Sequence, residues 1–110
     1  MAEARTLKLK GGSGTEYTYE IHTIGTTFKD IPGNYVFMKE TEAETWTVLY
    51  IGETGSLADR LNDPDSHHKI ECVRDEGGEH LGTHASSADE GERKKEEDDL
   101  LATRSPACQG

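Results

Sequence analysis

The sequence has few of the residues that build a large core. Hydrophobic residues make up 32% and aromatic residues 6% of its 110 residues, so we expect one domain over residues 1–110 with a modest core. No apolar run approaches the roughly 20 residues that cross a bilayer. The first ten residues also lack the apolar stretch of a secretory signal. These features predict a cytoplasmic protein that has no membrane partner.

Cysteine is scarce as well. The chain has two cysteines, Cys72 and Cys108, which is too few for a disulfide-based scaffold. We therefore expect two free thiols in a reducing compartment.

Positive charge is outnumbered by negative charge. The 12 Lys and Arg residues face 22 Asp and Glu residues, for a formal net charge of −10. This balance counts against nucleic acid as a partner, because phosphate neutralisation by a basic face supplies most of the affinity. The acidic residues gather in segments 75–79 and 88–99, however. A locally positive site therefore remains possible on an acidic protein. The basic residues that lie close together in the sequence are Arg60, His67, His68, Lys69 and Arg74.

Alternating apolar residues predict strands in the first half of the chain. Segments 6–10 and 16–22 flank the glycine-rich turn 11–15 and are expected to pair. After a connector that ends at residue 32, segments 34–39 and 46–52 are expected to form an antiparallel hairpin.

The second half has helix signals. Ser56 is a candidate N-cap for a helix that ends before Pro64, and a second short helix is expected within 67–75. Segment 78–86 is expected to be a loop with a short strand. A last helix over 87–104 would begin with a Ser87–Glu90 capping box.

Two short motifs in the predicted hairpin stand out. Gly33-Asn34-Tyr35 is followed by Tyr50-Ile51-Gly52, and the pair resembles the two-part signature of the GIY-YIG nuclease superfamily. Three further features fit the family spacing: Arg60 lies ten residues after Tyr50, Glu97 lies in the last helix, and two leucines and Pro106 follow it. The resemblance covers residues 33–109, and residues 1–32 add N-terminal strands and a connector.

The sequence departs from the family pattern at three places. Asn34 stands where an aliphatic residue is usual, and Gln109 stands where the family often has asparagine. Pro64 occupies the position of a family histidine or tyrosine. If residues 63–65 are an insertion, His67 takes that position and His68 lies beside it.

The resemblance implies an α/β (α+β) fold with a three-stranded, mainly antiparallel central sheet flanked by helices and an N-terminal β-hairpin extension. It also implies a metal-dependent DNA endonuclease that uses Mg²⁺ or Mn²⁺. Glu97 would hold the metal, and Arg60 would hold the scissile phosphate. Tyr35 would orient or deprotonate the attacking water with help from His67, and Tyr50 would supply a second hydroxyl.

These roles agree with the chemistry of phosphodiester hydrolysis. One carboxylate with waters and a substrate phosphate suits Mg²⁺, and a guanidinium can donate two hydrogen bonds to a phosphate. A phenol has a pKa of about 10, so a nearby cation or histidine must assist it as a base. Further residues expected to line the site are Gly52, His68, Lys69 and His84.

Two other functions fit the same residues. The fold could serve as a non-catalytic interaction module, which the acidic charge favours. Alternatively, a zinc site could be built from His67, His68, Cys72, His80 and His84. A nuclease without an attached DNA-binding module would bind DNA weakly or rely on a protein partner for target selection.

Overall fold

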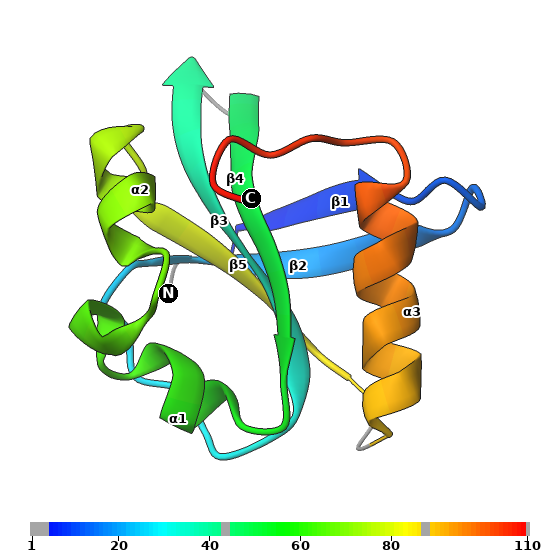
Figure 1. The fold of residues 1–110 in the computed structure, drawn as a ribbon, viewed down its shortest axis with the longest axis horizontal. Coiled ribbons are helices and arrows are strands. Elements are labelled where there is room, and N and C mark those ends of the chain that lie inside the picture. The colour runs from blue at the N-terminus through cyan, green and yellow to red at the C-terminus, as the bar shows by residue number, and fades with distance from the viewer. Residues whose placement is uncertain (1–4, 43–44, 87–88, 110) are drawn as a thin grey trace.

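The protein forms one five-stranded antiparallel sheet in a computed structural model that describes residues 5–42, 45–86 and 89–109. The strand order is β1-β2-β5-β3-β4 (Figure 1). The strands are β1 (Thr6–Lys10), β2 (Glu16–Thr23), β3 (Gly33–Glu42), β4 (Thr45–Thr54) and β5 (His80–Ala85).

The α+β architecture is confirmed, but the sheet is wider than the three strands predicted. β3 pairs with β4 on one side and with β5 on the other. β5 also pairs with β2, so the hairpin β1–β2 continues the same sheet instead of forming a separate extension. The weakly predicted strand in segment 78–86 therefore joins the two hairpins.

Helices cover both faces of the sheet (Figure 1). Helix α1 (Leu57–Leu61), the 3₁₀ turn η1 (Pro64–Ser66) and helix α2 (Ile70–Asp75) lie on one side, and helix α3 (Glu90–Leu101) lies on the other. In the described part of the chain, no helix has the length and apolar character that a membrane span requires.

The helix starts are only partly as predicted. Ser56 caps α1, because its side chain accepts a hydrogen bond from the amide of Asp59 at 3.1 Å. The Ser87 of the predicted capping box lies outside the described residues. Asp89 is the N-cap of α3 and accepts from the amide of Gly91 at 2.8 Å, so the helix begins and ends a few residues inside the predicted range.

Two hydrophobic clusters fill the two sides of the sheet. Tyr35 and Phe37 pack toward α1 and α2, whereas Val36 and Met38 pack on the α3 side with Leu100. Successive residues of a strand point to opposite faces. Both faces are covered, which explains why β3 is buried continuously from residue 33 to residue 38.

The prediction of two free thiols is wrong. Cys72 in α2 and Cys108 near the C-terminus form a disulfide, with Cα atoms 5.8 Å apart. Both residues pack against the cluster on the α1/α2 side, and the amide of Cys108 donates to the carbonyl of Leu49 in β4 at 2.9 Å. Tertiary packing thus brings together two cysteines that are 36 residues apart.

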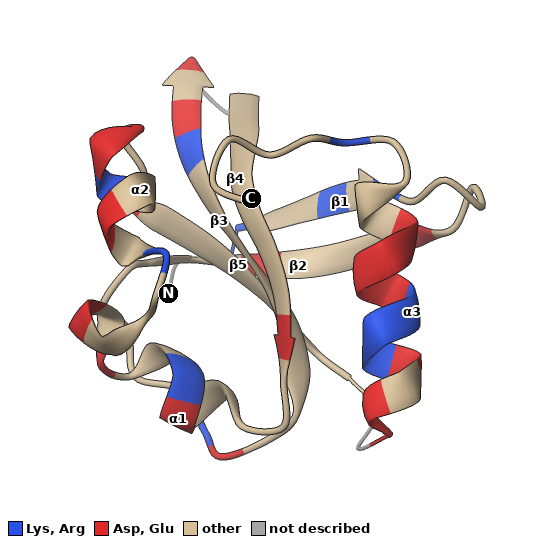
Figure 2. Cartoon of the chain, viewed as in Figure 1, with Lys and Arg blue, Asp and Glu red and all other residues tan. Residues whose placement is uncertain are grey.

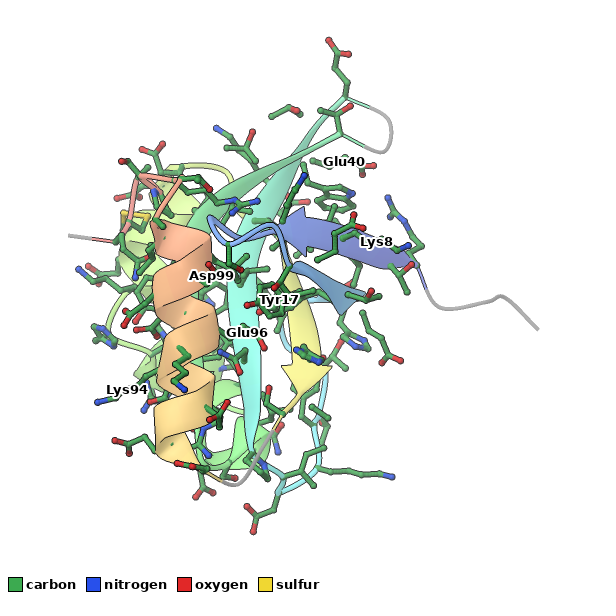
Figure 3. All side chains as sticks on the ribbon, turned by 90° about the vertical axis from the view of Figure 1, so that its right-hand side faces the viewer. Lys8, Tyr17, Glu40, Lys94, Glu96 and Asp99 are labelled. Atoms are coloured by element: carbon green, nitrogen blue, oxygen red, sulfur yellow. A yellow bond between two sulfur atoms is a disulfide. The ribbon has the colours of Figure 1, made fainter. Side chains whose placement is uncertain are left out.

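Helix α3 attaches to the sheet largely through polar side chains. Figure 2 shows acidic and basic residues along its whole length, and its buried residues are Arg93, Glu96 and Leu100. Figure 3 shows Glu96 and Asp99 on the side of the helix that faces β2. The Tyr17 hydroxyl donates to Asp99 at 2.7 Å, so even the last turn of the helix is held by hydrogen bonds.

Candidate active site

The two motif tyrosines lie on neighbouring strands but are not directly opposite each other. Tyr35 is paired with Gly52, and Tyr50 is paired with Phe37. The ring centroids of Tyr35 and Tyr50 are 6.1 Å apart. Tyr35 is fully buried, whereas Tyr50 is half-buried, so Tyr50 is the tyrosine that borders solvent.

Gly52 provides the space for the Tyr35 ring. A Cβ atom at Gly52 would lie 2.5 Å from Cζ and 2.6 Å from the hydroxyl oxygen of Tyr35. No side chain fits at such distances. The glycine of the second half-motif is therefore required for the tyrosine of the first half-motif to occupy its position.

His67 contacts the Tyr35 hydroxyl from the segment between η1 and α2. Its Nε2 lies 2.8 Å from that oxygen, and its Nδ1 accepts a hydrogen bond from the amide of Lys69 at 3.0 Å. A neutral imidazole carries one proton, and an Nδ1 that accepts a hydrogen bond leaves that proton on Nε2. His67 therefore donates a hydrogen bond to the oxygen of Tyr35.

The protonation of this pair follows from its burial. Burial, with smaller effects of His68 and Arg60, lowers the pKa of His67 to about 4, so the imidazole is neutral near pH 7. Burial and then Tyr50 raise the pKa of Tyr35, while the Arg60 guanidinium opposes this rise. The resting state is thus a neutral phenol that accepts a hydrogen bond from a neutral imidazole.

Arg60 and Glu97 both act on Tyr50 from different helices. Burial and then the Glu97 carboxylate raise the pKa of Tyr50, while Arg60 in α1 opposes the rise. No carboxylate lies within ion-pair distance of Arg60 in the described parts of the chain. An arginine beside two phenols, without a carboxylate partner, is suited to bind an anion such as a phosphate.

Glu97 lies where α3 passes over β4. Burial, followed by the negative charge of Glu53 and then of Asp98, raises the pKa of its carboxyl group, and Lys94 partly offsets this. Arg93, four residues before Glu97 in the helix, donates to Glu53 in β4 at 2.9 Å. The Glu97 carboxylate also acts on the Tyr50 phenol.

One carboxylate of this region, that of Glu97, could contribute to a divalent-cation site whose other ligands are water and substrate. Among the described residues, no group of three or more His, Cys, Asp and Glu side chains is arranged to hold a metal ion. Glu97 is a half-buried carboxylate with Glu53 nearby, and a hard divalent cation would relieve the repulsion between them. Glu97 is therefore the residue that could hold Mg²⁺ or Mn²⁺ here.

The other expected lining residues fall in two places. His68 is exposed and stacks on His67 with ring centroids 4.8 Å apart, and Lys69 contributes its amide to His67. His84 lies on the α3 face, opposite to Tyr35 and His67, and its Nδ1 is 3.0 Å from the Glu96 carboxylate. The hydrogen bond to Glu96 raises the pKa of His84, although burial opposes it.

One of the residues predicted as alternative zinc ligands cannot bind zinc in this structure. Cys72 is bonded to Cys108, so its sulfur is not available as a thiolate ligand. His84 also lies on the other face of the sheet from His67. The two regions of this proposed set are therefore separated by the sheet itself.

Three residues of this region were not predicted to contribute. Glu53 and Arg93 form the ion pair beside Glu97, and no sequence signal distinguishes them from surface charges. The side chain of Gln109 accepts from the amide of Ile51 at 2.8 Å and donates to its carbonyl at 2.9 Å. Its position at the end of the family pattern was the only signal that could have identified it.

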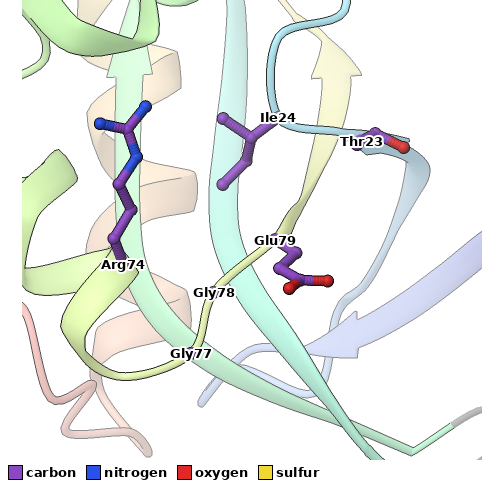
Figure 4. Close-up of a pocket in the computed structure, with 6 residues that line it drawn as sticks. All are labelled: Thr23, Ile24, Arg74, Gly77, Gly78 and Glu79. Atoms are coloured by element: carbon purple, nitrogen blue, oxygen red, sulfur yellow. The ribbon is translucent and has the colours of Figure 1, made fainter.

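One surface hollow lies away from these tyrosines. Figure 4 shows this hollow of about 480 Å³ between the end of β2 and the turn after α2, lined by Thr23, Ile24, Arg74, Gly77, Gly78 and Glu79. The Arg74 guanidinium is paired with Asp65 at 2.8 Å. This hollow shares no residue with the tyrosine site.

Comparisons with protein-family models, with curated proteins and with solved structures found no match to this chain.

Proposed function

We propose that this protein is a metal-dependent endonuclease of the GIY-YIG type, which hydrolyses DNA phosphodiester bonds with Mg²⁺ or Mn²⁺. The proposal is supported above all by the surroundings of Tyr50. Its ring lies 6.1 Å from the ring of Tyr35 and 5.3 Å from that of His67, and the charges of Arg60 and Glu97 both act on its phenol. Each of these residues has the chemistry that its place in the family pattern requires.

The residues divide the reaction among them. Arg60 binds the oxygens of the scissile phosphate and stabilises the charge that develops on them. Tyr35 and Tyr50 orient a water molecule for attack on phosphorus. As the new P–O bond forms and the bond to the leaving oxygen breaks, the attacking water releases a proton to solvent and the leaving oxygen takes one up from solvent. His67 donates to Tyr35, which fixes the ring and favours loss of the phenol proton. Glu97 would hold a divalent cation, which would supply Lewis-acid stabilisation of developing negative charge.

Incubation with plasmid, branched and single-stranded DNA at low salt, with Mg²⁺ or Mn²⁺, tests the proposal. We expect slow cleavage by the wild type and none by Glu97→Gln. Arg60→Ala should cleave at least about 100-fold more slowly, which is roughly the loss when one charge-stabilising group is removed. Glu92→Gln, at an exposed carboxylate of the same helix, serves as the matched control and should cleave normally. Cleavage that survives Glu97→Gln, or a folded wild type that cleaves none of these substrates, contradicts the proposal.

The main alternative remains a non-catalytic interaction module. It is favoured by the net charge of −10 and by the complete burial of Tyr35, which is also what a structural tyrosine shows. Under this alternative, the folded protein would leave all DNA substrates intact. Arg60→Ala and Glu97→Gln would then change neither cleavage nor DNA retention in a mobility assay.

A further inference from the structure

A row of polar side chains crosses the α3 face of the sheet. Asn34 in β3 is paired with Glu53 in β4 and with His84 in β5. The ring of His84 lies 5.6 Å from the ring of Tyr19 in β2. We call these four residues, one from each of four adjacent strands, the polar row.

Every member of the polar row bonds to one of two α3 residues. Glu53 accepts from the side chain of Arg93, and the Asn34 amide donates to the main-chain carbonyl of Arg93, both at 2.9 Å. The Tyr19 hydroxyl and His84 Nδ1 lie 2.5 Å and 3.0 Å from the same carboxylate oxygen of Glu96. Arg93 and Glu96 are three residues apart, so they share one side of the helix.

These contacts determine how α3 is rotated about its axis. Successive helical residues are about 100° apart, so fixing Glu96 against β2 and β5 turns Glu97 toward β4 and Tyr50. At the radius of a helical side chain, a rotation of about 20° would displace the carboxylate by roughly 2 Å. The apolar contacts of this helix come from Leu100, which is buried, and Leu101, which is partly buried, and such contacts fix a rotation far less strictly than directed hydrogen bonds.

Asn34 is the central member of the polar row. It is fully buried, and its side-chain carbonyl accepts from the Ser86 hydroxyl at 2.6 Å while its amide holds the helix. An aliphatic residue at this position, as the family pattern has, could make neither bond. The departure from the motif therefore provides the polar anchor for α3.

We propose that Asn34 and His84 are positioning residues, which set the rotation of α3 and thereby the place of the Glu97 carboxylate. The part of this inference that concerns metal binding by Glu97 rests on the proposed function. The part that concerns the rotation of α3 does not depend on that function. Asn34 bonds to Arg93 and His84 to Glu96, so both residues act on Glu97 through these helix residues.

The first test compares Asn34→Leu with Val36→Ala. Leucine keeps the shape of asparagine without its hydrogen bonds, and Val36 is a buried residue of the same strand and face. Two quantities are measured: Mn²⁺ affinity by electron spin resonance, and amide hydrogen exchange of residues 93–100 without metal. We expect Asn34→Leu to weaken Mn²⁺ binding about tenfold and to accelerate exchange in α3, whereas Val36→Ala changes only global stability.

His84 provides a second test, at a half-exposed position where folding should survive. His84→Ala removes the donor to Glu96 and should accelerate exchange in α3. His84→Asn keeps an N–H donor near Nδ1 and should restore slow exchange. If Asn34→Leu and His84→Ala both leave exchange in α3 unchanged, or if Val36→Ala accelerates it equally, the inference is overturned.

The same data separate this inference from the proposed function. If Glu97→Gln binds Mn²⁺ as tightly as the wild type, the metal role of Glu97 fails. The metal-free exchange rates then decide alone whether the polar row fixes α3. If Glu97→Gln abolishes Mn²⁺ binding while Asn34→Leu binds normally, the nuclease proposal stands and the positioning role is rejected.

Discussion

The two faces of the sheet are held by different forces. On the α1/α2 face, aromatic and aliphatic side chains form a buried cluster that the Cys72–Cys108 disulfide borders. On the α3 face, an apolar cluster from β1, β2, β3 and β4 includes Leu100 of the helix, and buried charged and polar side chains also bind the helix to the sheet. The first face therefore depends on burial, which is strong and tolerant of small shifts, and the second depends on directed bonds.

The candidate site lies at the boundary between these two regions. Tyr35 and His67 belong to the apolar side, and Glu97 comes from the polar helix. Apolar packing holds the Tyr35 ring, and hydrogen bonds determine where the carboxylate faces it. In a site of this kind, the apolar face of the sheet supplies stability and helix α3 supplies one oriented side chain. The predictions below test whether the two faces respond as differently as this comparison requires.

The largest effect is expected from the apolar face. Phe37 is 1% exposed, and its ring packs on those of Tyr35 and His67. Phe37→Ala should lower the free energy of unfolding by about 3 to 5 kcal/mol, through lost burial and a residual cavity. Urea unfolding measures this, and the loss should not depend on salt. Phe37→Leu should cost less than about 1.5 kcal/mol; equal losses for the two variants would contradict the cavity argument.

The disulfide should contribute slightly less. It closes a loop of 36 residues, for which chain entropy predicts about 3 to 4 kcal/mol. Urea unfolding with and without a dithiol reductant measures the contribution. The double variant Cys72→Ala/Cys108→Ala should match the reduced protein and be insensitive to reductant. An unchanged midpoint after reduction would show that packing alone holds α2 against the C-terminal segment.

On the polar face, removing one partner of an ion pair should lower stability because it leaves the other charge unpaired. Arg93 is 5% exposed and Glu53 lies beside it, so Arg93→Met leaves a mostly buried carboxylate without its cation. We expect a loss of about 3 kcal/mol, and the double variant Arg93→Met/Glu53→Met should recover much of it. A double-mutant cycle measures the coupling. Additive losses would mean that the pair is not energetically coupled, which would weaken the contrast with Phe37.

Local patterns were enough to predict several elements. Alternating residues in β3 and β4 and the short connection between them gave the hairpin, and Ser56 gave the start of α1. β5 was harder, because its few apolar residues and Gly82 carry little strand signal. Its place between β2 and β3 depends on long-range pairing, which no local pattern reports.

The site shows the same limit. Spacing predicted Tyr35, Arg60 and Glu97 as site residues, but it did not predict the pairing of Tyr50 with Phe37 in a hairpin whose register is irregular between Phe37 and Met38 and between Glu40 and Glu42. Such an irregularity depends on how the hairpin packs. The hydrogen bonds of Asn34 to α3 were also not predictable, because they join residues 59 positions apart. The sequence showed Asn34 only as a departure from the motif, and its role becomes visible only in its bond to α3.

The smallest effects should come from the histidines, which are expected to have opposite pH responses on the two faces. The pKa of His67 falls from 6.5 to about 4 on folding, so between these values the unfolded state binds a proton that the folded state does not. Stability should therefore decrease as the pH is lowered, by about 1 kcal/mol between pH 6.5 and pH 5.5. His67→Gln should flatten this slope.

His84 should act in the other direction and above pH 6.5. Its folded pKa is raised by Glu96, so its stabilising contribution is complete below pH 6.5 and is lost as pH rises through the folded value. His84→Gln should therefore reduce the loss of stability between pH 6.5 and pH 8, with a smaller effect because the ring is half-exposed. Urea midpoints from pH 5.5 to pH 8 measure both variants. If both substitutions change the dependence of stability on pH in the same pH range, the two histidines do not have different environments. The two faces would then differ in packing alone.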